Sequence, residues 1–572
     1  MLPFLHWPRL DRSLLRSEFW AGLTVGLMVI PQGVAYAALA GMPLVTGIYA
    51  SLLPALIAVL FSASTRLSVG PTALSCLVIS ASLTGLAAPG SAEWVALAAW
   101  LALLSGAFQA LLGLARCGWL LNLVSAPVLM AFTQAAALLI IGSQLASLLG
   151  LPSQAGLWQS LSAFAQQQPL PQPWHVLAAA MGLGALTLLV LARRWKPHFP
   201  SILVVVLASA GLSYAVGLEA QGAAVVGALP SGLPPLSLPA LPSLAQLSQL
   251  ALPALVISLI SFLETASSAQ VDNARAQRCW NQDQDLIGQG LGKIAAGLSG
   301  GFPTSASFSR SALNLYAGAQ SGWATVFSVL VIGAILLWAM PLLHHVPQSV
   351  LAAVVLVAVI GLVQPRAFLS LWRLSRTEAL IALLTFVVTL LSAPRLYWGV
   401  GLGLALSMGH QLWLRLHPRV IEVGLHPDGS LRDRGLWALA PLAPQTLALR
   451  MDAALDFTSA AFLERHITTL LADRPDTRAL CLFCQPINRI DATGVAALQR
   501  LLARCERSGI TLHLASLKLP IESALQRGGL LAPGGLPPAH SHLALHRTDA
   551  QACAQLRALN PCPASDSPTA RQ

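Results

Sequence analysis

Long apolar runs almost without charge fill the chain from about Ala21 to Leu414, and they constrain its fold more than any other feature. Only 10% of all residues are charged, whereas an ordinary soluble domain is about a quarter charged. The mean hydropathy is +0.69. Such runs cross a bilayer as helices, because there each backbone N–H and C=O must be satisfied within its own segment. The sequence therefore predicts an α-helical polytopic membrane protein followed by a soluble tail.

The apolar region divides into about fourteen segments, about seven in each half, each long enough to cross or partly cross a bilayer. Each half has a broken element in third position, at Gly70-Pro71-Thr72 and at Phe302–Ala312. Corresponding broken helices in two halves indicate a substrate site near the midplane, between inverted repeats. The other expected spans cover residues 19–39, 45–61, 94–114, 124–149, 176–191, 202–216, 252–269, 285–298, 324–343, 350–363, 379–391 and 398–416.

The second break, Phe302–Ala312, is rich in small hydroxyl residues and carries Arg310. Proline and serine here predict extended backbone that then starts a helix, whose first N–H groups have no partner within the helix. A helix N-terminus beside an arginine suits an anion. We therefore expect an anion-transport site.

The placement of basic residues predicts the topology. The formal net charge is +11, but no basic stripe with interleaved aromatic residues suggests a nucleic-acid partner. Arginines instead gather in alternate short loops, with Arg395 as the exception, so both termini are expected in the cytoplasm and the protein in the inner (plasma) membrane. Because charged residues precede the first span and no cleavage site follows it, no cleavable signal peptide is expected. His344 and His345 fall in an outer loop and are expected to be solvated.

We expect five regions: a cytoplasmic leader (1–18), a transmembrane domain (19–417), a linker (418–440), a small α/β domain (441–548) and a disordered tail (549–572). Strand and helix signals alternate in the fourth region, and the fifth is rich in Pro, Ala and Ser. Cys481 and Cys484 form a CxxC in a strand, where their side chains point to opposite faces. They are interpreted as structural cysteines, with no metal site, and no paired acids or Ser/His/Asp set indicates an enzyme.

Two long stretches resemble the SulP anion-transporter family, to which animal anion exchangers and prestin belong. They are AGLTVGLMVIPQGVAYAALAGMPLVTGIYASLLPALIAVLFSASTRLSVGPTALS (21–75) and DLIGQGLGKIAAGLSGGFPTSASFSRSALN (285–314). The soluble tail resembles the family's C-terminal STAS domain, with IDATG at Ile490–Gly494 as its marker. Ala492 stands where related bacterial regulators carry a phosphorylated serine, so that switch is not expected here.

The resemblance implies two inverted seven-segment repeats, arranged as a core domain that moves like an elevator against a gate domain. It implies that the anion lies between the two half-helix N-termini. Carried over by motif, the substrate-binding residues are Gln32, Tyr36, Thr72, Ala73, Ser307, Phe308, Ser309 and Arg310.

Glu264 is the one acid of its span, and an intramembrane acid is a functional-site hypothesis. In the family an acid at this point serves as a sodium ligand or a candidate proton carrier, and Ser268 would be a second ligand if sodium is used. Two alternatives stay open: Glu264 could instead pair with Arg310, and Lys293, where the family usually has asparagine, could add positive potential or pack locally.

The predicted function is secondary active transport of a small inorganic anion, foremost sulfate by proton symport, without a cofactor. Sodium-coupled transport of bicarbonate, and transport of chloride or dicarboxylate, are alternatives within the same family. A membrane anion sensor with the STAS domain as its output is an alternative of another class. A homodimer involving the STAS domain is the expected assembly.

Overall fold

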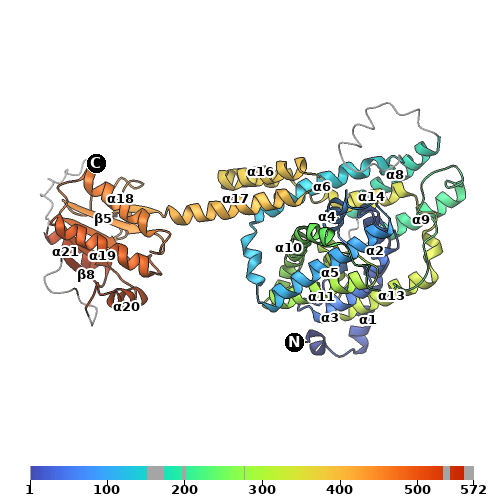
Figure 1. Cartoon of the computed structure of the whole chain (residues 1–572), viewed down its shortest axis with the longest axis horizontal. Coiled ribbons are helices and arrows are strands. Elements are labelled where there is room, and N and C mark those ends of the chain that lie inside the picture. Colours follow the sequence, from blue (N-terminus) through green and yellow to red (C-terminus); the bar gives the residue numbers. More distant parts are fainter. Residues whose placement is uncertain are drawn as a thin grey trace, which may run out of the picture. The chain divides into compact units, whose positions relative to one another are not determined.

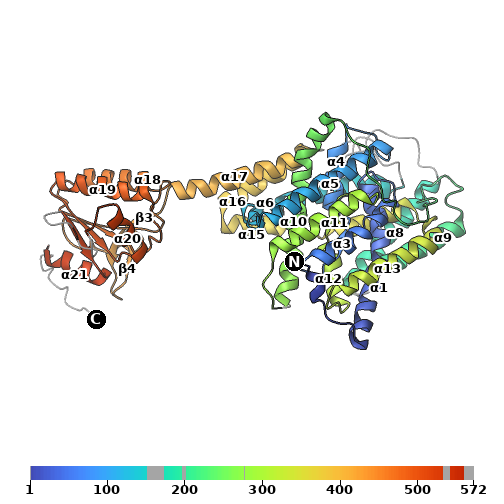
Figure 2. The same cartoon turned by 60° about the horizontal axis from the view of Figure 1, so that its bottom comes forward.

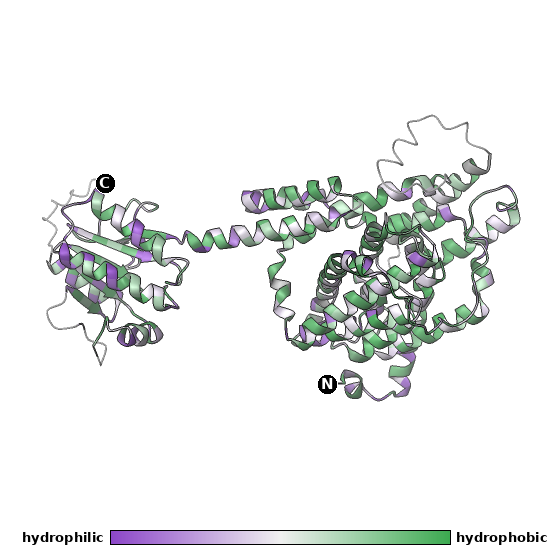
Figure 3. Cartoon of the chain, viewed as in Figure 1, coloured by the Kyte–Doolittle hydropathy of each residue, from purple (hydrophilic) through white to green (hydrophobic). Residues whose placement is uncertain are grey.

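The computed structural model describes residues 2–150, 173–195, 201–275, 277–393, 395–532, 537 and 542–559. The chain divides into two compact units, Met1–Ser407 and Met408–Gln572. The first unit is helical and mostly hydrophobic, whereas the second mixes strands and helices and carries many polar residues (Figures 1 and 3). Helix α17 (Tyr397–Leu416) contains the division between them.

The first unit confirms the predicted helical architecture. Among the described residues, five helical stretches are long and apolar enough to cross a membrane, and five shorter helices are also apolar. The number of crossings, about fourteen, stays a prediction. The helices are α1 (Arg12–Leu39), α2 (Thr46–Tyr49), α3 (Leu53–Phe61), α4 (Ala73–Leu83), α5 (Ala92–Leu114), α6 (Ala126–Leu148), α8 (Pro173–Trp195), α9 (Ser201–Val216), α10 (Leu244–Arg275), α11 (Gln282–Leu298), α12 (Phe308–Tyr316), α13 (Trp323–Trp338), α14 (Gln348–Ile360), α15 (Pro365–Leu374) and α16 (Arg376–Leu391), with 3₁₀ helices η1 (Pro3–His6), η2 (Gly118–Leu123) and η3 (Met340–Leu343).

Helix packing in the first unit follows a pattern that two related halves would produce. Helix α1 packs along α13, and α10 packs along α5 (Figure 2). In the predicted repeats, α1 corresponds to α10 and α5 to α13, so each pair is the counterpart of the other. Helices α3 and α11, which also correspond, pack against each other. Each of these helices thus packs against a helix of the other half in an equivalent way, which supports the predicted inverted repeats.

The two broken elements pair with each other through a short antiparallel ladder. Strand β1 (Val69–Gly70) lies against β2 (Ser305–Ala306), with Gly70 opposite Ser305. The N–H of Ser307 extends the ladder by donating to the carbonyl oxygen of Ser68 at 3.0 Å. Extended backbone at membrane depth survives only when its polar groups find partners within the protein. Each break therefore supplies the partners of the other, and the starts of α4 and α12 are held next to this ladder.

Buried ionic and polar contacts hold the loop that leads into β1. The carboxylate of Asp285 accepts from the Ser64 N–H at 2.9 Å, the Ser64 hydroxyl at 2.6 Å and the Trp280 indole at 2.7 Å. Arg66 forms an ion pair with Asp272 at 2.6 Å. Because these contacts join the loop to α10 and α11, they fix where β1 meets β2.

The second unit contains one six-stranded sheet, in the order β4-β3-β5-β6-β7-β8. Strands β5 to β8 are parallel, and β3 is antiparallel to both β4 and β5. The linker expected at 418–440 is therefore wrong, because β3 and β4 fall within it and belong to the sheet. The strands are β3 (Val420–Leu425), β4 (Leu431–Asp433), β5 (Thr446–Met451), β6 (Ala479–Phe483), β7 (Thr511–Ala515) and β8 (Leu543–His546).

Helices cover both faces of this sheet. Helices α18 (Ala460–Asp473), α19 (Ala492–Arg507) and α20 (Leu519–Arg527) contribute to one apolar cluster, and α21 (Asp549–Leu559) contributes to the cluster on the other face (Figure 2). The disordered tail expected from Asp549 is thus wrong for residues 549–559, because Ala552 and Leu556 are buried against the sheet. Residues 560–572 lie outside the described residues.

Cys481 and Cys484 lie in different clusters on opposite faces of the sheet, as the strand periodicity predicts. Both are free and buried. Burial raises the pKa of the Cys484 thiol to about 12 and holds the pKa of Cys481 well above its usual value. Since the thiolate is the reactive and metal-binding form, both cysteines act as small apolar core residues.

Candidate functional site

Helices α4 and α12 begin differently at the paired breaks. Thr72 caps α4, its Oγ1 accepting a hydrogen bond from the N–H of Ser75 at 3.4 Å. Ser307 precedes α12 in extended conformation without a side-chain cap on that helix. The backbone N–H groups in the first turn of α12 therefore receive no hydrogen-bond acceptor from a capping side chain. They lie at the positive end of the helix dipole.

Arg310 reaches from the first turn of α12 across to the other break. Only 1% of its surface is exposed, and its Nη1 donates to the carbonyl oxygen of Pro71 at 2.9 Å. Its Nε and Nη2 are buried without a hydrogen-bond partner among the described residues. A buried charged donor without a partner is costly, so such a site gains strongly from an anionic ligand.

Glu264 of α10 lies beside the same breaks. Its Oε2 accepts a hydrogen bond from the Thr72 hydroxyl at 3.1 Å, and the Ser305 hydroxyl faces the same carboxylate. The ion pairs of the described residues do not include one between Glu264 and Arg310. The acid therefore contacts both breaks through hydroxyl groups, and it lies close enough to the Arg310 guanidinium to interact with it electrostatically without a direct ion pair.

Ser268 lies one turn after Glu264 but does not face its carboxylate. Its hydroxyl donates to the backbone carbonyl of Glu264 at 3.2 Å. Serine hydroxyls in helices often bond in this way to the preceding turn. This bond directs the hydroxyl to the helix backbone and weakens the case for Ser268 as a sodium ligand.

Helix α1 supplies one wall of the site and packs against both α4 and α12. Gln32 and Tyr36 are buried on it, and the Oε1 of Gln32 has no hydrogen-bond partner among the described residues. Tyr36 lies close enough to Arg310 and Glu264 to interact with both electrostatically. Ala73, the first residue of α4, is also buried.

The remaining predicted residues, Ser307, Phe308 and Ser309, form the outer side of the α12 start. Phe308 is 57% exposed, and the hydroxyls of Ser307 and Ser309 lie 3.3 Å apart. The eight predicted substrate residues thus divide into a buried group around Arg310 and an accessible group at the helix start. Their role in binding stays a prediction.

Lys293 is fully buried in α11, where polar side chains of α5 and α10 surround it. Its Nζ donates to the Oε1 of Gln109 at 2.5 Å and to the Oγ of Ser261 at 2.6 Å. Ser261 lies one turn before Glu264 on α10, and Lys293 is close enough to Glu264 to interact with it electrostatically, so both local packing and a contribution to the positive potential stay open. Sequence reasoning missed Gln109, Ser261 and Ser305. A lone lysine in an apolar helix does signal polar neighbours, but it does not say which helices supply them.

The IDATG stretch of the second unit starts a helix. The Oδ1 of Asp491 caps α19 by accepting from the N–H of Gly494 at 2.8 Å, and its Oδ2 accepts from the N–H of Phe457 at 3.0 Å. Gly494 packs directly against the backbone of Leu455, where a side chain would collide. The motif is therefore explained by local structure, and Ala492 offers no hydroxyl for phosphorylation.

Comparison with known proteins agrees with this geometry. The model of the sulfate permease family matches residues 15–385, and that of the STAS domain matches residues 439–536. A probable sulfate transporter of Mycobacterium tuberculosis is 32% identical over 524 residues, 91% of this chain and 92% of its own length. This chain belongs to the sulfate permease family. As a SulP protein it is a membrane transporter and not an enzyme.

Plant relatives and solved structures extend the SulP match. Probable sulfate transporter 3.4 of Arabidopsis thaliana is 27% identical, over 94% of this chain and 85% of its own length. A structure of the anion transporter SLC26A9 superposes with a TM-score of 0.85 at 19% identity and covers 98% of this chain and 93% of that one. The transmembrane domain of a cyanobacterium bicarbonate transporter, BicA, gives a TM-score of 0.59 at 22% identity, covering 70% of this chain and 99% of that one. At these identities the structures establish the fold alone.

Proposed function

We propose that this SulP protein is a secondary active transporter that moves sulfate together with protons across the inner membrane. The observation that carries the proposal is Arg310, a buried guanidinium beside two helix starts, with two nitrogens that find no hydrogen-bond partner in the part of the chain that the structure describes. A sulfate would accept from the guanidinium and from backbone N–H groups of α12, as oxyanions do at helix N-termini. Relatives named as probable sulfate transporters make sulfate the first choice among anions.

Proton coupling is assigned to Glu264. An acid that accepts from the Thr72 hydroxyl and lies close to the anion site can hold a proton when the anion is bound and release it afterwards. Proton binding next to a doubly charged anion also reduces the charge that must cross the membrane. The alternative, sodium coupling, would need several oxygen ligands around the ion, and Ser268 directs its hydroxyl to the helix backbone instead.

Transport is proposed to follow an elevator-like movement of a core against a gate. The proposed core contains α1 to α5 and α10 to α13, so the β1–β2 ladder and all ten predicted site residues move together with it. Cytoplasmic termini and a homodimer involving the STAS domain belong to the same proposal. The arginine-rich loops support the orientation.

Uptake into proteoliposomes tests the proposal. Labelled sulfate, bicarbonate, chloride and succinate are supplied in turn, with proton and sodium gradients imposed separately. We expect sulfate accumulation that follows the proton gradient and ignores the sodium gradient. Sulfate uptake that is indifferent to protons contradicts symport, and the absence of transport for all four anions favours the sensor alternative.

A further inference from the structure

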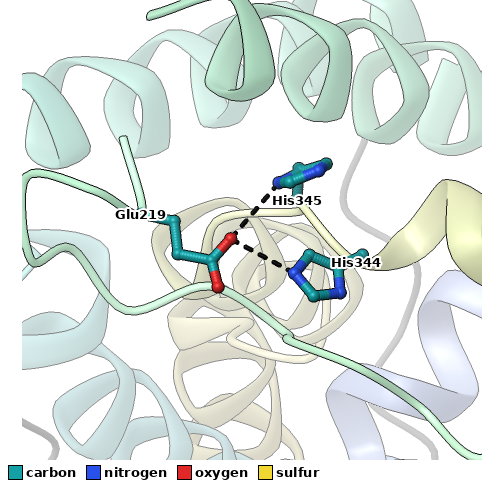
Figure 4. A group of neighbouring side chains, drawn as sticks. All are labelled: Glu219, His344 and His345. Atoms are coloured by element: carbon teal, nitrogen blue, oxygen red, sulfur yellow. Dashed lines mark hydrogen bonds and ion pairs between the residues drawn. The ribbon is translucent and has the colours of Figure 1, made fainter. Parts of the chain in front are cut away.

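A second polar cluster lies away from the anion site, at the turn after α9 and the connection between η3 and α14. The Nε2 of His344 lies 3.2 Å from the Oε2 of Glu219, and the Nδ1 of His345 lies 3.4 Å from the same oxygen. Figure 4 shows both imidazoles directed toward this carboxylate. All three side chains reach solvent, and the histidines are about one-third exposed, at 31% and 34%.

We propose that Glu219, His344 and His345 bind a zinc ion. Imidazole nitrogens with a carboxylate oxygen form a common three-ligand set for Zn²⁺, with water in the fourth position. Bonds of about 2.0–2.2 Å in tetrahedral geometry place neighbouring donor atoms about 3.3 Å apart. The two donor separations match this value, and one ligand atom from each residue lies within 4.8 Å of the others.

The backbone around the cluster is held in place before any metal binds. The segment after Glu219 pairs with the segment containing the histidines, because the Gly227 N–H donates to the His344 carbonyl at 3.0 Å and the Gln348 N–H donates to the Ala224 carbonyl at 3.0 Å. The ring of His345 also packs on Tyr214, with centroids 5.0 Å apart. Such preorganisation lowers the entropy that metal binding must overcome.

The bound ion would replace the direct contacts between the two imidazoles and the carboxylate with metal–ligand bonds. It would join the turn after α9 to the connection between η3 and α14, adding a metal link to the backbone hydrogen bonds there. Partial exposure leaves an entry path and room for a water ligand. Zinc is preferred over magnesium or calcium, because two of the three donors are imidazoles.

Cobalt titration of the full-length protein in lipid nanodiscs tests the site, with a purification tag that contains no histidine. Tetrahedral Co²⁺ absorbs visible light strongly, whereas hydrated Co²⁺ does not, so the spectrum reports geometry as well as binding. We expect one Co²⁺ per chain with tetrahedral bands that Zn²⁺ displaces. Glu219→Gln, His344→Gln and His345→Gln should each weaken binding about tenfold or more. His6→Gln, which changes an exposed histidine elsewhere, should leave binding unchanged.

The variant His345→Cys should add a new absorption band, and a misfolded protein would not produce such a band. The Nδ1 of histidine lies close to the backbone, so a cysteine sulfur can take its place and add a sulfur-to-cobalt charge-transfer band. Absence of tetrahedral bands in the wild-type protein would overturn the proposal. Equal binding by the wild-type protein and the three ligand variants would also overturn it, because the metal would then be held elsewhere.

Discussion

Arg310 and Pro71 join the two broken helices of this SulP protein, because the Arg310 Nη1 donates to the Pro71 carbonyl oxygen at 2.9 Å. The two residues belong to different halves of the transmembrane unit, 239 positions apart. The bond uses one nitrogen of the guanidinium and leaves Nε and Nη2 buried without partners among the described residues. One side chain thus joins the two helix starts and keeps two donor nitrogens, which the proposed function assigns to the anion.

Replacing Glu264 with glutamine should separate coupling from binding. The amide still accepts from the Thr72 hydroxyl but cannot carry a proton, so proton-driven accumulation of sulfate should be lost while sulfate exchange across the membrane persists. Both are measured in proteoliposomes with and without a proton gradient. Glu93→Gln, at an exposed position on α5, is the matched control. Accumulation that persists in Glu264→Gln would remove this residue from the coupling mechanism.

Thr72 caps α4 and donates a hydrogen bond to Glu264. A pair of variants distinguishes the loss of its hydroxyl from a change in side-chain volume. Thr72→Val removes both the cap of α4 and the donor to Glu264, and losing such a cap costs about 1 kcal/mol. We expect a lower melting temperature of the purified transporter and a changed pH dependence of uptake. Thr72→Ser, which keeps the hydroxyl, should restore both. If valine behaves like serine, the hydroxyl has neither role.

His513 should make the STAS domain sensitive to acid. It is buried in β7, with its Nδ1 2.9 Å from the Nε2 of His546, and burial lowers the pKa of His513 from 6.5 to about 4. Between these values the unfolded chain binds the proton and the folded one does not, so stability is complete above about pH 6.5 and declines toward pH 4. Hydrogen exchange of β7 and β8 in the full chain, corrected for intrinsic rates, measures this.

His513→Asn provides the comparison for the acid sensitivity. It removes one titrating group and keeps a polar side chain opposite His546, so the decline in stability below pH 6.5 should be shallower. An identical pH profile in the variant would show that other groups account for the acid sensitivity.

The sequence predicted the two breaks because they are local signals: Gly70-Pro71 and the Ser-rich stretch interrupt long apolar runs. Their pairing into a ladder follows from the lack of water at membrane depth, which leaves each break as the other's partner. The contacts of Lys293 with Gln109 and Ser261 were not predictable in the same way. They join three helices across large sequence separations, and no local pattern specifies such partners.

Short elements were missed because their local signal is weak. Strand β4 has three residues, among them Arg432 and Asp433, and it is recognisable only from its pairing with β3. In α21 the apolar pair Ala552 and Leu556, four residues apart, did carry a helical signal. The Pro- and Ser-rich composition of the residues after it outweighed that signal in the sequence interpretation.

The KM for sulfate uptake in Arg310→Gln tests the central claim most directly. Loss of a charged donor to the anion should raise the KM about tenfold or more, which corresponds to about 1.4 kcal/mol or more. Arg278→Gln, at an exposed position outside the site, should leave the KM unchanged. If Arg310→Gln folds and transports sulfate with the wild-type KM, Arg310 only joins the two breaks, and the anion binds elsewhere.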